Sequence, residues 1–456
     1  MKIENPANGA LVAEVTEDTP ATVAAAYERA RRAQPGWAAT PLAERLAAIK
    51  RFRNLVFAKR SELALTLTRE MGKPVKQALN ELGALPGRID FFLEHTAAVL
   101  GEETVLSQAD GALDEVIRQE PLGVVANVSA WNYPWFVGSN VFIPALLTGN
   151  TVLYKPSEHA TLTGQRIGEL LHEAGVPADA FVTVVGGGPV GAAVVEQPVD
   201  GVFFTGSYAT GRRIAERVAP RMIRLQLELG GKDPTYVTDD VDVQAAAEGL
   251  ADGAMYNGGQ SCCSVERIYV HAAVEQAFLD AFVGVVKGFK IGDPEDAATY
   301  IGPLARKEQL LVLDEQVAAA LGRGARLLTG GRRAAQGGAY FEPTVLSGAS
   351  NEMRVMRDES FGPIIGIARV TSDDEAVALM NDTDYGLTAG VYSRDTERAL
   401  RILERVNAGT VYVNACDRVS PRLPWTGRKH SGVGSTLSTY GIRAFLQPKA
   451  WHKKRG

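Results

Sequence analysis

Two adjacent cysteines, Cys262 and Cys263, stand in the stretch NGGQSCCSVE and raise the question of which, if either, is a nucleophile. A thiol becomes nucleophilic once it is activated to the thiolate, but free cysteine is also among the most buried residue types. Cys262 follows GGQS and precedes a strand-like segment, so we expect it in a loop with room for a substrate. The third cysteine, Cys416, is expected to pack in a core or to line a pocket wall.

Four further stretches carry polar or glycine residues where predicted strands end. They are SAWNYPW with Asn132, YKPSE with Lys155 and Glu158, FTGSYATG with Gly206, Ser207 and Gly211, and LELGGK with Glu228. Each alone is explained by an ordinary turn or helix cap. Together they indicate a binding edge, because the carboxyl ends of parallel strands meet at one edge of a sheet.

The hydrophobic pattern predicts the elements that position these residues. Between 122 and 228 five runs rich in β-branched residues alternate with helical segments: LGVVANVSAW, GNTVLYKP, FVTVV, DGVFFTG and LQLELGG. This alternation predicts an α/β fold with a parallel, doubly wound sheet covered on both faces. Residues 19–99 are expected to be helical, a hairpin is expected at 103–121, a second α/β region at 229–432, and a strand in the tail at 440–452.

Composition and charge restrict the class of protein. The 456 residues carry a net charge of -5 without a basic block, which argues against a nucleic-acid partner. Three cysteines, two of them adjacent, argue against a disulfide framework and favour a reducing compartment. The start of the chain has no signal-peptide pattern and no apolar run reaches about 18 residues, so we expect a cytoplasmic protein without membrane contact. No metal site is expected.

A series of motifs runs through nearly the whole chain, from NPANG to SGVG: EPLGVV, WNYPW, GNTVLYKPSE, FTGS, ELGGK, GGQSC, ESFGP and YGLTAGVYS. In this order and spacing they resemble the aldehyde dehydrogenase superfamily, and the chain is similar to its short succinic semialdehyde dehydrogenases. The resemblance implies a Rossmann-like NAD-binding domain (1–102 and 122–228), an α/β catalytic domain (229–432), and a small β element for oligomerisation (103–121 and 433–456). That element implies a homodimer or a homotetramer.

The resemblance also implies the reaction. Cys262, the last residue of GQSC, attacks an aldehyde, and Cys263 is its neighbour in the pocket. The amide of Asn132 and the backbone N–H of Cys262 stabilise the oxyanion, and one such donor is typically worth about 2.7–4 kcal/mol. The hemithioacetal gives a hydride to the nicotinamide. Glu228 then activates water as a general base, and thioester hydrolysis releases a carboxylic acid.

The cofactor contacts follow from the same resemblance. Lys155 and Glu158 are expected at the adenosine ribose, where a carboxylate favours NAD because it repels the 2′-phosphate of NADP; NADP stays open because Lys155 is adjacent. Gly206 and Ser207 are expected at the pyrophosphate. The remaining predicted residues are Gly188 and Pro189 near the adenine, Glu359 at the nicotinamide ribose, Phe361 beside the nicotinamide, and Trp131, Ser157 and Leu229 elsewhere along the cofactor.

The charge of the substrate is predicted from position 140. Succinic semialdehyde dehydrogenases typically place an arginine eight residues after the catalytic asparagine, whereas this chain has Asn140. The residues expected to line the substrate tunnel are Tyr133, Val137, Asn140, Cys263 and Val419. A neutral aliphatic or aromatic aldehyde is therefore predicted. Succinic semialdehyde is the alternative, if Arg418 or Arg422 in DRVSPR binds its carboxylate.

The chain departs from the common family pattern near its C-terminus. PWTGRKHSG replaces a phenylalanine-glycine-glycine stretch, and Ser435 and Thr436 replace an arginine-glutamate pair, which weakens the case for a proton relay there. Other functions fit less well. A coenzyme-A-acylating relative tends to lack the glutamate at Glu228, and a non-catalytic relative would have lost Cys262 or Glu228. A thiol hydrolase needs a Cys–His pair, and no histidine stands in such a motif.

Overall fold

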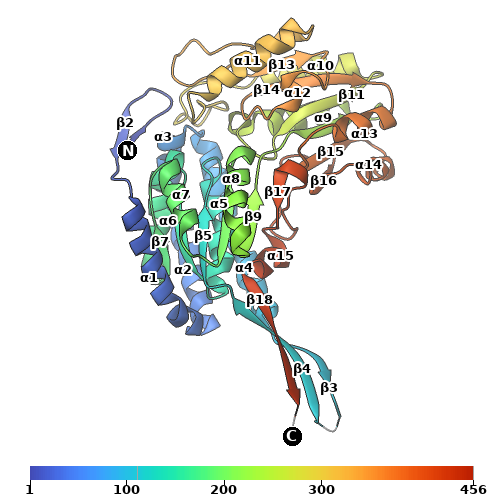
Figure 1. Ribbon diagram of the computed structural model, residues 1–456. Coiled ribbons are helices and arrows are strands. Elements are labelled where there is room, and N and C mark those ends of the chain that lie inside the picture. Colours follow the sequence, from blue (N-terminus) through green and yellow to red (C-terminus); the bar gives the residue numbers. More distant parts are fainter. Residues whose placement is uncertain (110, 455–456) are drawn as a thin grey trace.

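The computed structural model describes residues 1–109 and 111–454. Figure 1 shows two α/β lobes, one above the other, and an antiparallel sheet that projects downwards from the lower lobe. The lower lobe is formed mostly by the first half of the chain and the upper lobe by the second half. None of the described helices is long and apolar enough to cross a membrane.

The sheet of the lower lobe has the order β17-β9-β8-β5-β6-β7. Its strands are β5 (Val124–Val128), β6 (Thr151–Lys155), β7 (Phe181–Thr183), β8 (Gly201–Thr205), β9 (Arg224–Glu228) and β17 (Gly432–Val433). The first five pair in parallel, which confirms the predicted parallel sheet. β17 adds an antiparallel edge strand from near the C-terminus, which the sequence pattern did not predict.

Helices cover both faces of this sheet. α1 (Pro20–Ala39), α7 (Gly188–Glu196) and α8 (Tyr208–Val218) share a core with Val124, Ala126 and Val128. Val125 instead packs on the other face, in a core with α2 (Leu42–Ala58), α3 (Arg60–Met71), α4 (Val75–Leu100), α5 (Pro134–Leu147), α6 (Thr161–Glu173) and α15 (Ser438–Arg443). Successive side chains of a strand point to opposite faces, so the sheet is covered on both faces and doubly wound, as predicted.

The sheet of the upper lobe has the order β12-β13-β14-β11-β10-β15-β16. Its strands are β10 (Asp233–Val237), β11 (Val265–His271), β12 (Arg326–Thr329), β13 (Thr344–Ser347), β14 (Ile364–Val370), β15 (Thr388–Tyr392) and β16 (Thr410–Val413). Its helices are α9 (Val243–Met255), α10 (Glu275–Lys287), α11 (Gln309–Gly322), α12 (Arg354–Arg357), α13 (Asp373–Asn381) and α14 (Thr396–Leu403).

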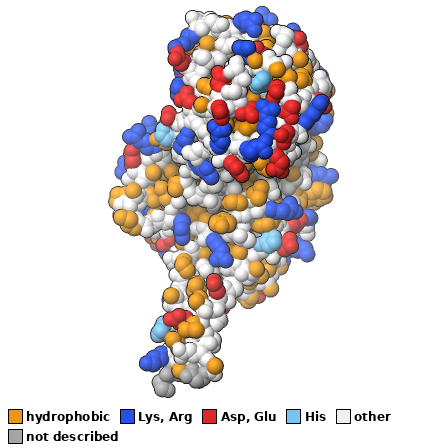
Figure 2. Space-filling model, turned by 90° about the vertical axis from the view of Figure 1, so that its right-hand side faces the viewer, with side chains coloured by type: hydrophobic (Ala, Val, Ile, Leu, Met, Phe, Trp, Pro, Cys, Tyr) orange, Lys and Arg blue, Asp and Glu red, His pale blue; other side chains and the backbone are white. Residues whose placement is uncertain are grey.

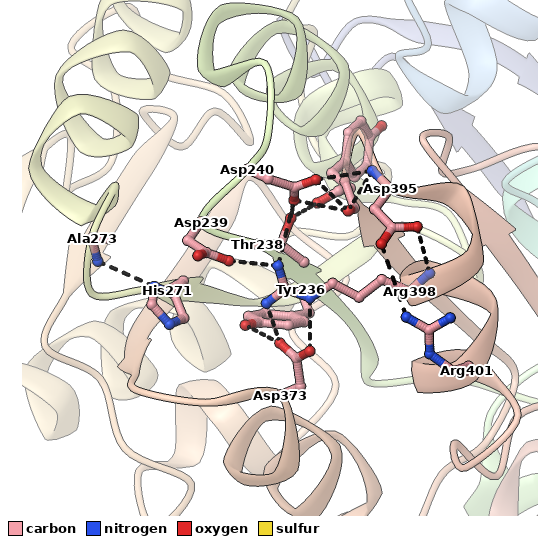
Figure 3. A network of polar contacts seen from close by, with 12 residues as sticks. Tyr236, Thr238, Asp239, Asp240, His271, Ala273, Asp373, Asp395, Arg398 and Arg401 are labelled. Carbon is pink, nitrogen blue, oxygen red and sulfur yellow. Dashed lines mark hydrogen bonds and ion pairs between the residues drawn. The ribbon is translucent and has the colours of Figure 1, made fainter.

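A polar network fixes two helices of the upper lobe to the end of β10 (Figure 3). Arg398 on α14 contacts Asp373 at the start of α13 and Asp239 just after β10, with both N–O distances at 2.6 Å. The hydroxyl of Tyr236 on β10 donates to the same Asp373 carboxylate at 2.9 Å. These contacts stabilise the side of the upper lobe through charge-assisted hydrogen bonds.

The projecting sheet consists of β3 (Glu103–Ser107), β4 (Leu113–Pro121) and β18 (Leu446–Lys454) in the order β18-β4-β3. All pairings are antiparallel, so the strands predicted at 103–121 and in the tail are present. The remaining short elements are β1 (Lys2–Glu4), β2 (Leu11–Glu14), η1 (Glu158–Ala160), η2 (Ala219–Arg221), η3 (Tyr256–Gly259) and η4 (Lys429–Ser431).

Candidate active site

A cleft of about 1270 Å³ opens at the carboxyl ends of β5, β6, β8 and β9 and is closed on its other side by loops of the upper lobe. This is the edge at which open α/β sheets bind ligands. The structure brings most of the predicted catalytic and cofactor residues to its walls: Trp131, Asn132, Lys155, Ser157, Glu158, Gly188, Gly206, Ser207, Glu228, Leu229, Cys262, Glu359 and Phe361. Pro189 is not among the lining residues; it follows Gly188 in the first turn of α7.

The loop before Cys262 is held beside Asn132. Asn257, Gly258 and Gly259 all have left-handed backbone angles, which turn the chain sharply after α9. A Cβ at Gly259 would lie 2.2 Å from the carbonyl oxygen of Gly362, so only glycine fits there. The side-chain amide of Asn132 donates to the carbonyl of Gln260 at 3.1 Å. The loop geometry therefore places the Asn132 amide next to the segment that carries the thiol.

The two adjacent thiols have different environments. Cys262 is half-buried and lines the cleft, whereas Cys263 is only 4% exposed and its thiol donates to Asp417 Oδ1 at 3.0 Å. A hydrogen bond with Cys262, burial and the Asp417 charge raise the pKa of Cys263 well above its ordinary value. Cys263 is thereby held as a neutral thiol, and of the pair only Cys262 is open to the cleft. Cys416 is buried and its thiol donates to the carbonyl of Gly249, as expected for packing.

Glu228, the last residue of β9, presents a carboxylate that is buried but borders the cleft. Burial raises its pKa above the ordinary value, although hydrogen bonds from Thr436 and Gln226 oppose this effect. The Thr436 hydroxyl and the Gln226 amide both donate to Oε1 of Glu228. Thr436 lies in the segment that departs from the family pattern, so this segment contacts the predicted general base directly. No pattern in the sequence indicated that contact.

The cofactor side of the cleft fits a dinucleotide. Ser207 caps the N-terminus of α8, where unpaired backbone N–H groups favour phosphate. Lys155 Nζ lies 3.3 Å from Glu158 Oε2. Burial works against ionisation of Glu158, yet Lys155 and the local hydrogen bonds lower its pKa overall, so it is a carboxylate at neutral pH. A ribose can bond to this carboxylate, and the cleft is long enough to reach from here to Cys262.

The far end of the cleft carries the residues predicted for the nicotinamide. The Glu359 carboxylate accepts a hydrogen bond from Gly231 N–H at 3.1 Å, and burial together with Glu266 raises its pKa to about 8. The ring of Phe361 meets that of Trp131 edge-on at a centroid distance of 5.5 Å. Residues that sequence reasoning missed also line the cleft: Arg213, Arg217 and Arg306. Arg213 and Arg217 follow FTGSYATG on α8, and their positive charge was the only feature of the sequence that could have indicated a role in the cleft.

The predicted substrate residues do not line this large cleft. Tyr133, Val137 and Asn140 lie at the beginning of α5 and within its first turns. Lys73 Nζ stands 3.7 Å from the centroid of the Tyr133 ring. Val419 packs against the same apolar cluster as Cys262. Their role as a tunnel lining stays a prediction.

Comparison with known proteins agrees with this geometry. The chain matches the aldehyde dehydrogenase family over residues 1–451. It is 36% identical to betaine aldehyde dehydrogenase from Cereibacter sphaeroides over 448 residues, which is 98% of this chain and 92% of that protein.

The solved structures that match this chain with a TM-score of 0.96 include the following two. One is an NAD-dependent aldehyde dehydrogenase from Sinorhizobium meliloti, 35% identical, with 99% of this chain and 91% of the other covered. The other is an NADP-dependent enzyme of E. coli, 33% identical, with 100% and 94% covered. The fold and cleft are those of an oxidoreductase that acts on aldehydes with NAD or NADP, and the chain belongs to the aldehyde dehydrogenase family.

Proposed function

We propose that the protein oxidises an aldehyde to the free carboxylic acid through a thioester on Cys262. The observation that carries this proposal is the placement of Cys262, the Asn132 amide and the Glu228 carboxylate on one cleft. A coenzyme-A-acylating enzyme needs no general base to activate water. Here Glu228 borders the same cleft as Cys262 and accepts hydrogen bonds from two donors. The test is a panel of aldehydes with NAD, followed by NADH absorbance and by detection of the free acid.

Each residue of the site has a separate chemical role in this proposal. The Cys262 thiolate forms a C–S bond to the carbonyl carbon, and the oxyanion accepts hydrogen bonds from the Asn132 amide and the Cys262 N–H. The bound cofactor supplies the acceptor for the hydride that leaves this carbon. Glu228 removes a proton from water, which attacks the thioester; the C–S bond breaks, the acid leaves, and the thiolate is restored.

We expect NAD to be preferred over NADP in kcat/KM. Glu158 is an ionised carboxylate beside the expected ribose, and it repels a 2′-phosphate. Glu158→Gln is expected to shift the NADP-to-NAD ratio of kcat/KM towards NADP by about tenfold, the equivalent of roughly 1.4 kcal/mol. Glu169→Gln, on the exposed part of α6, is the control and should leave the ratio unchanged. A wild-type enzyme that prefers NADP would contradict the assignment.

Substrate charge is not set by family membership, since the betaine aldehyde dehydrogenase relative is named for a cationic aldehyde. Asn140 carries no charge, and from this position alone the sequence predicts a neutral aliphatic or aromatic substrate. The alternative, succinic semialdehyde, requires a cation near the tunnel. Arg418 and Arg422 are both exposed on their loop, so they are weak candidates for that cation.

We also propose that the projecting sheet joins subunits into a homodimer or homotetramer. Every residue of its edge strand β3 is exposed, including Val105 and Leu106, and Figure 2 shows hydrophobic side chains along the projection. An exposed edge with apolar side chains pairs readily with another chain. Light scattering at micromolar concentration should give a dimer or tetramer mass, and Val105→Lys should shift it towards the monomer. A monomeric wild type would refute the proposal.

A further inference from the structure

An arginine that the sequence analysis did not single out lies buried behind the catalytic residues. Arg88 is on α4 and is only 5% exposed. Its Nη1 donates to Oδ1 of Asn140 at 2.8 Å, and its guanidinium lies 4.1 Å from the centroid of the Phe136 ring. Both contacts are with α5, the helix that begins directly after the predicted oxyanion residue Asn132. Two different side chains therefore fix the orientation of the guanidinium.

Arg88 is a cation without an ion-pair partner in the described part of the chain. Burial lowers its pKa to about 10, which still leaves it protonated at neutral pH. The titratable groups that influence its pKa are Glu228, Glu81 and Cys263. Glu81 is already paired with Lys73 at 2.5 Å, and Glu228 is bound by Thr436 and Gln226. A buried cation that lacks a close anion is costly, so the site is suited to an anion supplied from outside the chain.

The donors that remain have the geometry for such an anion. A guanidinium offers five N–H donors in a planar fork that matches a carboxylate. Among the described residues, the Asn140 oxygen accepts the only side-chain hydrogen bond from Arg88, and the Asn140 amide nitrogen makes none. The other guanidinium nitrogens and this amide nitrogen are not among the fully buried polar atoms that lack a hydrogen-bond partner in the described part of the chain. Glu228 and Cys263 both influence the pKa of Arg88, so the guanidinium lies near the residues predicted for catalysis and for the substrate tunnel.

We propose that Arg88, oriented by Asn140 and Phe136, binds a distal anionic group of the aldehyde substrate. The inference rests on the proposed function and deepens it: the substrate is an aldehyde with a carboxylate or sulfonate at its other end. It replaces the neutral tunnel predicted from Asn140 alone, because the cation comes from α4 instead of position 140. Asn140 then acts as a positioning residue for the arginine and as a second donor.

The test is the ratio of kcat/KM for an anionic aldehyde to that for a neutral aldehyde of similar length. Succinic semialdehyde and 3-sulfopropanal are compared with butanal and pentanal in the wild type and in Arg88→Met. We expect the wild type to favour an anionic aldehyde, and Arg88→Met to lower the ratio by about 10- to 150-fold, the factor that corresponds to roughly 1.5–3 kcal/mol for a hydrogen bond to a charged group. Which of the two anions gives the higher ratio distinguishes carboxylate from sulfonate.

Because both rates come from the same preparation, the ratio is insensitive to a partial loss of folded enzyme. Arg88→Lys keeps the charge and should retain part of the preference, while Arg418→Met and Arg422→Met on the exposed loop should not change it. If Arg88→Met does not fold, Asn140→Ala should lower the same ratio. A wild type that favours neutral aldehydes, an equal loss for both classes, or a ratio that falls only in the loop variants would overturn the inference. A wild type that oxidises no aldehyde would instead refute the proposed function.

Discussion

Cys262→Ala is expected to abolish dehydrogenase activity, by at least about 10⁴-fold, whereas Cys263→Ala keeps a substantial fraction of it. Without the Cys262 sulfur no covalent intermediate forms, so hydride removal has no hemithioacetal to act on. Cys263 is buried and donates to Asp417, and its raised pKa keeps it protonated. Steady-state NADH formation by the two variants is the measurement.

The pair of variants is internally controlled, because the two positions are adjacent and the substitution is the same. Labelling by iodoacetamide at neutral pH should modify Cys262, which lines the cleft, before Cys263. Protection of Cys262 by an aldehyde substrate would support its role further. An inactive Cys263→Ala together with an active Cys262→Ala would show that the assignment of the nucleophile is wrong.

Glu228→Gln is expected to slow thioester hydrolysis by about 10²- to 10⁴-fold, the usual contribution of a general base, and to change acylation much less. The amide of glutamine has nearly the same shape as the carboxylate but cannot take a proton from water. Rapid mixing with NAD and aldehyde should then show a burst of NADH close to one per site, followed by a slow steady state. Equal loss of the burst and of the steady state would argue against a role confined to hydrolysis.

The same residue gives a pH dependence. Glu228 must be ionised to act as a base, and burial raises its pKa. Where hydrolysis limits the rate, activity should therefore fall as the pH is lowered through this raised pKa. The hydrogen bond from Thr436 favours the ionised form, so Thr436→Val should move the acidic limb of the profile to higher pH, and Thr436→Ser should restore it. If the acidic limb of the Thr436→Val profile does not shift, Thr436 does not influence the pKa of the general base.

Much of the fold was predictable because its signals are local. The five parallel strands of the lower lobe are short apolar runs ending in polar or glycine residues, and each run carries this pattern within itself. The residues at their ends, such as Asn132, Glu158, Ser207 and Glu228, reach one cleft because parallel strands share one carboxyl edge. β17 escaped prediction because two residues have no periodicity, and only pairing with β9 makes them a strand.

What the tertiary structure alone decided is which side chains meet across the site. Arg88 reaches Asn140 over 52 positions because α4 packs against α5, and this packing places a buried cation beside the residue from which a neutral tunnel was predicted. Thr436 reaches Glu228 over 208 positions, and Cys263 reaches Asp417 over 154. Such contacts leave no local pattern, because they depend on how packed elements orient side chains that are distant in the chain. The sequence by itself therefore predicted residues that meet in one cleft, and the packing decided what surrounds them.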